Sequence, residues 1–319
     1  ENQLVPKAGF ELRHIPKVLM PRQFTPATLI WPVKIVFATL KAIKVCRDAD
    51  LVIGFGGYAC PPIYLAAALL RKPIFIHEAN AIPGWANRLG AVFASEIFIA
   101  FTRTQKKIGR WRSAKLSGMP IRAEIIAAAK LSSDESSQIK NDQLEKWNLS
   151  KTKPTILVFG GSQGSRHINE AILQSLSAFT EKGVQVVHSV GRSNALPTST
   201  ENYLPLSYID DMSSAYHAAD LIIARSGALT CAELAAVGKF AILIPLPIGN
   251  GEQSANAFDL QAAGAAELVA DNKFNADWLI SNWDEIWRKA SSFKPVNQGE
   301  FSASEIIGKM IIDCVEDNK

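Results

Sequence analysis

The sequence predicts an α/β protein with two Rossmann-like domains, each built on a doubly wound parallel sheet. Short apolar, β-branched runs alternate with helical patterns along the 319 residues, as doubly wound sheets require. The strand candidates are almost continuously apolar, which is typical of parallel strands buried on both faces. A polar, charge-rich stretch over 123–153 interrupts this alternation. We therefore expect a first domain over 1–122, a linker region over 123–153 and a second domain over 154–300.

The expected elements follow one another in a regular order. In the first half, strands are expected at 51–55, 74–77 and 97–101, a short strand and turn at 114–122, and helices at 26–47, 61–71 and 85–94. In the second half, strands are expected at 155–159, 184–188, 221–224, 241–244 and 267–270, and helices at 166–182, 228–237, 253–263 and 277–290. A last amphipathic helix over 303–315 could pack on either domain.

Composition excludes several classes of function. The content of 48% hydrophobic and 20% charged residues is that of a folded globular protein. A net charge of +4, without a dense Lys/Arg run, argues against nucleic-acid binding. The longest apolar runs, such as 63–70, are far shorter than the roughly 20 residues that span a bilayer. The four cysteines form no CxxC pair, which argues against a zinc site or a disulfide framework.

The sharpest local motif is TILVFGGSQGSRHIN over 155–169. A strand runs into Gly160–Gly164, and a helix follows. Glycines let the backbone approach a ligand, and the N–H groups at a helix start favour a phosphate. Ser162 can add a hydroxyl hydrogen bond. The competing interpretation is a tight turn that binds nothing.

A second strand-turn-helix motif, ARSGALTCAELAAVGK over 224–239, places a carboxylate on a helix. Thr230 and Glu233 have the T-x-x-E spacing of a capping box, which predicts a structural carboxylate. The alternative is that Glu233 accepts hydrogen bonds from two ribose hydroxyls, as acidic residues do in dinucleotide folds. The residues alone leave both roles open.

Polar side chains also follow other expected strands. Gln253 lies at a helix start in IPLPIGNGEQSANA, where its amide could pair with sugar hydroxyls or simply solvate a loop. In FIHEANAIPGWANR, His77, Glu78 and Asn80 follow the carboxyl end of a strand, where open α/β sheets bind ligands. His77 and Glu78 are candidates for acid/base chemistry or for bracing the loop.

Taken together, these motifs resemble the MurG family of glycosyltransferases. HEAN-x-x-PG-x-x-N, SGMPIR, GGSQG, IDDM, RSGALT-x-x-E and E-Q-x-x-N-A occur in the family's order, from one end of the chain to the other. The resemblance implies a GT-B fold, with two Rossmann-like domains facing across a cleft. It implies inverting, metal-independent transfer of GlcNAc from UDP-GlcNAc to the 4-hydroxyl of MurNAc in undecaprenyl-diphospho-MurNAc-pentapeptide (lipid I), without a cofactor.

The resemblance also gives roles to residues for the donor. Arg122 and Ser162 match positions near the diphosphate, the Ile209 backbone matches the position that reads uracil, and Gln253 and Asn80 match positions that hold GlcNAc. The nucleotide loop, in which Glu233 binds the ribose, comprises Ala228, Leu229, Thr230, Cys231, Ala232 and Glu233.

On the acceptor side, Tyr58, His77 and Glu78 match the polar rim that faces lipid I, with His77 and Glu78 as weak catalytic candidates. The family's glycine-rich loop GGTGGH, which supplies the favoured general-base histidine, is not in this sequence. We therefore expect that about 30–40 N-terminal residues are missing, roughly one βα unit with its next strand. Alternatives are a UDP-GlcNAc-binding fragment without turnover, or another GT-B enzyme acting on UDP-sugars.

Because the family's acceptor is a membrane lipid, the resemblance implies a peripheral protein on the cytoplasmic side of the cell membrane, with cell-wall synthesis complexes as further partners. The segment 28–47 mixes apolar and basic residues, including Trp31, Ile35 and Lys34. Apolar groups rimmed by cations suit an anionic membrane surface. The alternative is an ordinary amphipathic helix that buries its apolar face on the sheet.

Overall fold

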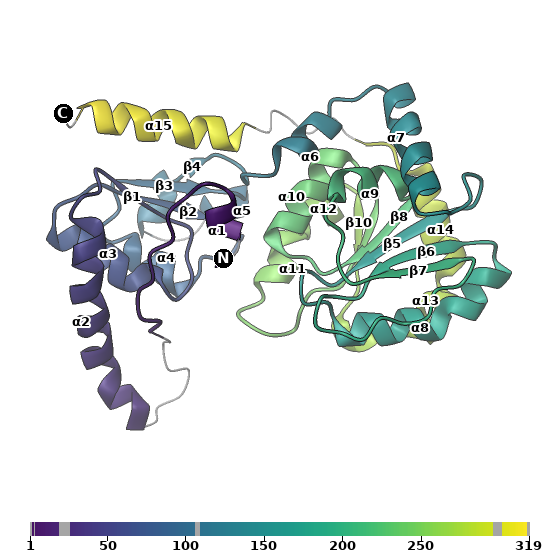
Figure 1. The fold of residues 1–319 in the computed structure, drawn as a ribbon, viewed down its shortest axis with the longest axis horizontal. Helices are drawn as coiled ribbons and strands as arrows, with labels where there is room; N and C mark the ends of the chain where they lie inside the picture. The colour runs from purple at the N-terminus through teal and green to yellow at the C-terminus, as the bar shows by residue number, and fades with distance from the viewer. Residues whose placement is uncertain (1, 3, 19–25, 106–108, 296–301, 318–319) are drawn as a thin grey trace. The chain divides into compact units, whose positions relative to one another are not determined.

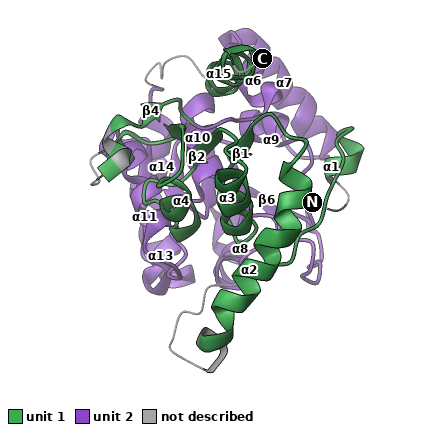
Figure 2. Ribbon diagram, turned by 90° about the vertical axis from the view of Figure 1, so that its left-hand side faces the viewer, with its two compact units in different colours: residues 1–118, 303–319 green, residues 119–302 purple. Residues whose placement is uncertain are grey.

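The computed structural model describes residues 2, 4–18, 26–105, 109–295 and 302–317, which fall into two compact units. Unit 1 spans residues 1–118 and 303–319, and unit 2 spans residues 119–302 (Figure 2). Each unit contains its own parallel sheet, so the prediction of two parallel-sheet α/β domains is confirmed.

Unit 1 has a four-stranded parallel sheet in the order β1-β2-β3-β4 (Figure 1). The strands are β1 (Val52–Gly54), β2 (Ile74–Glu78), β3 (Glu96–Ile99) and β4 (Lys115–Leu116). The helices are α1 (Leu4–Lys7), α2 (Pro26–Cys46), α3 (Cys60–Leu69), α4 (Trp85–Gly90), α5 (Thr102–Gln105), the 3₁₀ helix η1 (Gly109–Ser113) and α15 (Ala303–Asp317).

Helices cover both faces of the unit 1 sheet. On one face, Tyr64 of α3 and Ala42 of α2 join a core with the apolar strand residues. On the other face, Ile307 of the C-terminal helix α15 packs against Phe75 and Phe98. The last helix therefore belongs to unit 1, although most of unit 1 precedes unit 2 in the chain. Within the described helices, none has both the length and the apolar character needed to cross a membrane.

Unit 2 has a six-stranded parallel sheet in the order β10-β9-β8-β5-β6-β7. The strands are β5 (Thr155–Phe159), β6 (Gln185–Ser189), β7 (Tyr203–Leu206), β8 (Leu221–Ala224), β9 (Ala241–Leu243) and β10 (Ala266–Leu268). The helices are α6 (Ala123–Ala128), α7 (Ser133–Lys146), α8 (Arg166–Glu181), α9 (Met212–Ala218), α10 (Ala228–Val237), α11 (Glu252–Asn256), α12 (Phe258–Ala262), η2 (Asp271–Lys273), α13 (Ala276–Ser281) and α14 (Trp283–Ser292).

The side chains of the unit 2 sheet alternate between two helical layers. Ile156 and Val158 point into a core with α8, α13 and α14, which includes Phe179 and Trp283. The intervening residue Phe159 contacts Tyr216 of α9 on the opposite face, with ring centroids 6.1 Å apart. Every residue of β5, β6 and β8 is buried, as predicted for parallel strands that are covered on both faces.

The segment 123–153 is not a separate linker but forms α6 and α7 within unit 2. Ser132 and Glu135 form a capping box that starts α7. Ser136 Oγ lies 2.8 Å from His217 Nδ1, which anchors α7 to α9. The polar composition arises because α7 lies on the surface and buries only Gln143 and Leu144.

Two further differences from the expected elements have local causes. The helix expected over 277–290 is two helices, because Asn282 turns its amide back to the Trp278 carbonyl at 2.7 Å between them. Strand β7 was not expected, because it is short and contains Pro205. Proline is tolerated there because β7 is an edge strand, where one side of the backbone needs no ladder partner.

Candidate functional site

Two loops meet at the carboxyl edge of the unit 2 sheet. Strands β5 and β8 are parallel neighbours, but the chain winds from β5 toward β6 on one side and from β8 toward β9 on the other. Ligands of open α/β sheets bind at such a change of direction. The loop 160–165 leads from β5 into α8, and the loop 225–227 leads from β8 into α10.

The loop 160–165, which we call the phosphate loop, requires glycine for its conformation and for space. Gly161 and Gly164 have φ values of 88° and 74°, which other residues rarely adopt. A Cβ on Gly164 would lie 1.9 Å from the Val190 carbonyl oxygen. Ser165 caps α8 by accepting a hydrogen bond from the Ile168 N–H. The result is a helix start of the type that suits an anion.

Glu233 is a buried carboxylate in which one oxygen accepts a hydrogen bond and the other accepts none from the described residues. The Tyr216 hydroxyl donates to Oε2 at 2.9 Å, and Arg122 Nε lies 3.8 Å from Oε1. Oε1 accepts no hydrogen bond from the described residues, although Glu233 is only 3% exposed. An unsatisfied buried carboxylate oxygen is costly, so a ligand hydroxyl at this position would be favourable.

The capping-box role of Glu233 is wrong. Helix α10 begins at Ala228 with Gly227 as its N-cap, and no side chain caps it. Thr230 and Glu233 therefore lie inside the helix rather than across its start. Burial raises the pKa of Glu233, whereas the hydrogen bond from Tyr216 and the charge of Arg122 lower it.

A pocket of about 260 Å³ brings together most residues predicted for the nucleotide. The predicted residues in its wall are Arg122, Ser162, Ile209, Leu229, Thr230 and Glu233. The wall also contains Phe159, Gly161, Ser189, Tyr208, Met212 and Tyr216. Within the described residues, the backbone N–H and C=O of Ile209 make no hydrogen bond. A donor and an acceptor are thus available together, as an imide group of a base requires.

The remaining predicted donor residues do not line this pocket. Ala228, Cys231 and Ala232 lie on α10 outside its wall. Burial raises the pKa of the Cys231 thiol to about 12, which keeps it protonated and chemically quiet. Gln253, on the first turn of α11, accepts a hydrogen bond from the Leu246 N–H at 2.9 Å and so fixes the loop before its helix.

In unit 1, Glu78 is the centre of a hydrogen-bond network that fixes the loop after β2. Its Oε1 accepts from the Asn80 backbone N–H at 2.9 Å. Its Oε2 accepts from the Gly84 N–H and from Asn87 Nδ2, both at 3.0 Å. The Tyr64 hydroxyl in turn donates to Asn87 Oδ1 at 2.8 Å. Since Glu78 is 2% exposed and fully engaged, these contacts favour the bracing role.

His77 is likewise enclosed. Its Nε2 lies 2.9 Å from the Gly118 carbonyl oxygen, which can only accept, so Nε2 carries the proton. Its Nδ1 has no partner among the described residues, and burial lowers the pKa of the ring, which keeps it neutral. Tyr58 differs from both, because it is 43% exposed on the loop between β1 and α3.

Arg225 organises the site but was missed by sequence reasoning. Its Nη1 pairs with Asp271 and donates to the Ile244 carbonyl at 3.1 Å, and its Nη2 donates to Ser165 Oγ at 2.7 Å. Arg225 therefore ties the cap of the phosphate loop to the loops after β9 and β10. The only signal for Arg225 in the sequence was its position directly after a strand. No motif near Tyr216 in the sequence indicated that its side chain would lie beside Glu233.

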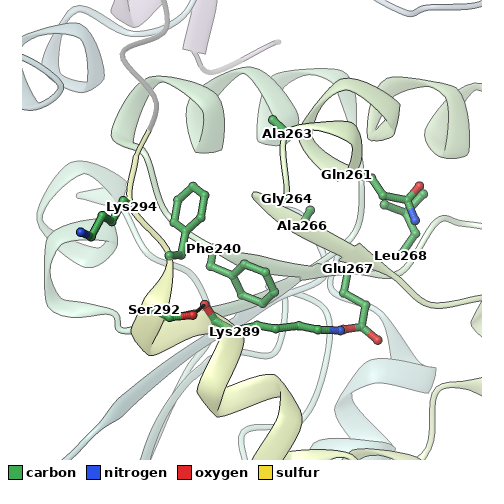
Figure 3. A pocket seen from close by; sticks show the side chains of 11 residues that line it. Phe240, Gln261, Ala263, Gly264, Ala266, Glu267, Leu268, Lys289, Ser292 and Lys294 are labelled. Carbon is green, nitrogen blue, oxygen red and sulfur yellow. Dashed lines mark hydrogen bonds and ion pairs between the residues drawn. The ribbon is translucent and has the colours of Figure 1, made fainter.

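Two further observations concern other possible binding sites among the described residues. A larger pocket of about 660 Å³ lies beside the edge strand β10, and none of the predicted site residues lines it (Figure 3). Its Lys289 and Glu267 pair with each other at 2.9 Å, so these two charges already have partners. In the part of the chain that the structure describes, no group of three His, Cys, Asp or Glu residues could hold a metal ion.

Comparison with known proteins finds one family along the chain. Residues 1–99 match the glycosyltransferase family 28 N-terminal domain, and residues 155–308 match its C-terminal domain. The Thermobifida fusca UDP-N-acetylglucosamine–N-acetylmuramyl-(pentapeptide) pyrophosphoryl-undecaprenol N-acetylglucosamine transferase is 41% identical, over 88% of this chain and 73% of that protein. The protein of the same name from Corynebacterium diphtheriae is 39% identical, over 100% of this chain and 87% of that one.

Solved structures show the same architecture. The crystal structure of Acinetobacter baumannii MurG has a TM-score of 0.69 and 27% identity, covering 98% of this chain and 88% of that chain. The S. aureus MnaA–UDP structure has a TM-score of 0.60 at 14% identity, covering 88% of this chain and 79% of that chain, and shows the fold alone.

Proposed function

The chain belongs to glycosyltransferase family 28, and from this we propose that it transfers GlcNAc from UDP-GlcNAc to lipid I. The acceptor is the 4-hydroxyl of MurNAc in undecaprenyl-diphospho-MurNAc-pentapeptide, and the product is the lipid II of peptidoglycan synthesis. The protein is an enzyme with the two α/β domains of the GT-B type.

The observation that carries the donor site is the Oε1 atom of Glu233, which is buried 3.8 Å from Arg122 Nε and accepts no hydrogen bond from the described residues. It lies in one pocket with Ser162 of the phosphate loop and with Ile209, whose backbone groups are open. A uridine diphosphate would use all three features, with its base on Ile209, its ribose hydroxyls on Glu233 and its diphosphate on the phosphate loop. In this arrangement the Glu233 carboxylate would accept charge-assisted hydrogen bonds from the ribose, which are stronger than hydrogen bonds between neutral groups.

The reaction needs positive charge where the leaving UDP becomes more negative. Arg122 and Ser162 lie in the wall of the pocket, and Ser162 belongs to the phosphate loop that leads into the start of α8. Fixed donors of this kind stabilise developing charge without having to reorganise. We propose that these groups stabilise the diphosphate without a metal, and that the acceptor oxygen attacks the anomeric carbon from the opposite side, with inversion.

For the sugar and the acceptor we propose supporting roles in unit 1. Asn80 is proposed to contact GlcNAc, as is Gln253, and the exposed Tyr58 is proposed to contact the acceptor. The enclosed hydrogen bonds of His77 and Glu78 support a role in holding the Asn80 loop rather than in moving protons. We therefore propose that both residues hold this loop and take no part in proton transfer.

We further propose that the protein binds the cytoplasmic face of the cell membrane through α2, where it meets lipid I and cell-wall synthesis complexes. Apolar residues on α2 that are more than half exposed are Leu29, Ile30, Val33, Val36, Phe37 and Leu40. The exposed Lys34, Lys41 and Lys44 lie among them. Trp31 and Ile35, which were expected in this surface, face inward: Trp31 packs on Trp85 and Ile35 is 8% exposed.

Two other functions use the same pocket. A GT-B enzyme with a different acceptor would bind UDP-GlcNAc but would need no apolar surface for a lipid. A UDP-GlcNAc-binding fragment would bind the donor without turnover. The exposed stripe on α2 favours the lipid acceptor over the first alternative.

The decisive experiment is transfer of radiolabelled GlcNAc from UDP-GlcNAc to a lipid I analogue. Labelled disaccharide lipid should form with the wild-type protein and fall sharply with Glu233→Ala. Binding of UDP-GlcNAc without product would support the fragment. Conversion of the donor in the absence of lipid I would support another UDP-sugar enzyme.

A further inference from the structure

A second loop packs tightly against the phosphate loop. We call residues 190–194, which follow β6, the bracket loop. Gly191 has a φ of 98°, and a Cβ on it would lie 2.3 Å from the Gln163 backbone. The Asn194 side-chain amide donates to the Gln163 carbonyl at 2.9 Å and to the Val190 carbonyl at 2.7 Å. The bracket loop thus fixes the phosphate loop from outside.

We call the pocket of about 260 Å³ the nucleotide pocket, with Ser162 at its phosphate end and Tyr208 and Ile209 at its base end. Arg192, at the centre of the bracket loop, contacts a residue at each end. Its backbone N–H donates to the Ser162 carbonyl at 3.3 Å. Its guanidinium lies over the Tyr208 ring, 4.0 Å from the ring centroid. Tyr208 precedes Ile209 in the chain, and both line the pocket, whereas Arg192 does not. Arg192 therefore reaches the pocket only through its neighbours.

The stacked guanidinium should restrict where the Tyr208 ring can lie. Tyr208 is partly exposed at the rim of the pocket, where a ring without a partner has several rotamers available. A cation over the ring face favours one of them, and at exposed sites this attraction corresponds to a factor of about 2–5 in an equilibrium constant. Held in this way, the Tyr208 ring forms the wall of the pocket beside the Ile209 backbone N–H and C=O, which make no hydrogen bond within the described residues.

We propose that Arg192 is a positioning residue for the nucleotide, which holds Tyr208 as the wall of the base end while its loop holds the phosphate loop. This inference rests on the proposed function, since it takes the pocket to bind a uridine diphosphate. One short loop then sets the distance between the base end and the phosphate end. Asn194 serves the phosphate end, and the Arg192 side chain serves the base end.

The test compares uridine with UDP, because uridine reports on the base end alone. Affinities are measured by calorimetry for UDP and by displacement for uridine. Arg192→Ala should weaken both ligands by the same factor of about 2–5, and Arg192→Lys should recover part of the loss because a cation remains. Asn194→Ala should weaken UDP more than uridine. In a Tyr208→Ala background, Arg192→Ala should have no further effect.

Arg288→Ala is the matched control, since Arg288 is an exposed arginine on α14 in the same unit. Loss of UDP but not uridine affinity in Arg192→Ala would overturn the inference and place the guanidinium on the diphosphate. An undiminished loss in the Tyr208→Ala background would overturn it too. If the wild-type protein itself binds no UDP, the proposed function fails, which separates the two results. Unchanged melting temperatures show that the variants are folded.

Discussion

The Tyr216 hydroxyl donates a hydrogen bond to one oxygen of the Glu233 carboxylate, and the other oxygen accepts no hydrogen bond from the described residues. Tyr216 comes from α9 and Glu233 from α10, so two helices fix the direction of the carboxylate. Both residues line the nucleotide pocket. This second oxygen is therefore held in place before any ligand binds, which lowers the side-chain entropy that the protein loses on binding.

Glu233→Ala should weaken UDP binding by about 1.5–3 kcal/mol, the range for a hydrogen bond to a charged group. Tyr216→Phe should cost less, because it removes the support of the carboxylate and not the carboxylate itself. Calorimetry with UDP measures both effects. Equal UDP affinity in wild type and Glu233→Ala would remove Glu233 from the ribose.

Much of the fold could be predicted because its signals are local. The expected strands at 155–159 and 221–224 and the helix at 228–237 match the structure residue by residue. Continuous apolar runs with glycine at their ends define such elements without tertiary information. The role of α7 was missed, since a surface helix that buries two side chains leaves almost no periodic signal. The break at Asn282 was missed because the amphipathic pattern continues on its far side, in α14.

The site was predictable only in part, because only some of its residues belong to local sequence motifs. Ser162 and Glu233 belong to compact motifs, and the structure places both in one pocket. Tyr216 and Arg225 act through partners that are 17 and 46–60 residues away in the chain. Trp31 was placed on the wrong face, because a helix with apolar residues all around has no pattern that marks its buried side.

Arg122→Ala and Ser162→Ala should slow turnover more than they weaken binding of UDP. Both side chains line the pocket beside the phosphate loop, where charge grows as the diphosphate leaves. Loss of one such donor lowers kcat about 10²–10³-fold. Steady-state transfer to a lipid I analogue separates kcat from KM. A raised KM with kcat within a few-fold would mean that these residues bind only the ground state.

Treatment with EDTA should leave transfer activity unchanged. In the proposed reaction, Arg122 and the N–H groups of the phosphate loop supply the positive charge that a divalent ion supplies in other enzymes. The measurement is product formation after dialysis against EDTA, with and without added Mg²⁺. Complete loss that Mg²⁺ restores would contradict the metal-independent mechanism.

The stability of unit 2 should fall between pH 7 and pH 5, with His188 as one cause. His188 is buried between the Tyr203 hydroxyl at 3.1 Å and Asn169 Oδ1 at 3.0 Å, and burial lowers its pKa from 6.5 to about 4. Below pH 6.5 the unfolded chain binds a proton that the folded protein does not. Stability is therefore lost as the pH falls from 6.5 toward 4, by about 2 kcal/mol at pH 5.

Urea unfolding at the two pH values measures this loss. His188→Gln keeps a hydrogen-bonding side chain but cannot titrate, so its free energy of unfolding should fall less between pH 7 and pH 5. His14→Gln alters an exposed histidine in unit 1 and should keep the wild-type dependence. Equal pH dependence in wild type and His188→Gln would assign the effect to other groups.

Binding to anionic vesicles should depend on the outward side of α2. The variant Val33→Ser, Val36→Ser, Phe37→Ser removes apolar side chains that are 67%, 57% and 54% exposed, so it should fold normally. Loss of these groups weakens insertion into the interface, and Lys34→Glu reverses one attraction of about 1 kcal/mol to anionic headgroups. Co-sedimentation with such vesicles should therefore fall with either change, and with added salt in the wild type.

Two control variants distinguish an effect specific to α2 from a general loss of exposed apolar surface. Leu173 and Leu196 of unit 2 are also exposed, at 40% and 57%, and Leu173→Ser with Leu196→Ser should leave vesicle binding unchanged. Trp31→Ala should mainly lower the melting temperature, because Trp31 packs on Trp85 rather than facing outward.

If the triple serine variant and Lys34→Glu both bind vesicles as the wild type does, the membrane surface is not on α2. If the unit 2 control loses binding equally, the interaction is not specific to unit 1.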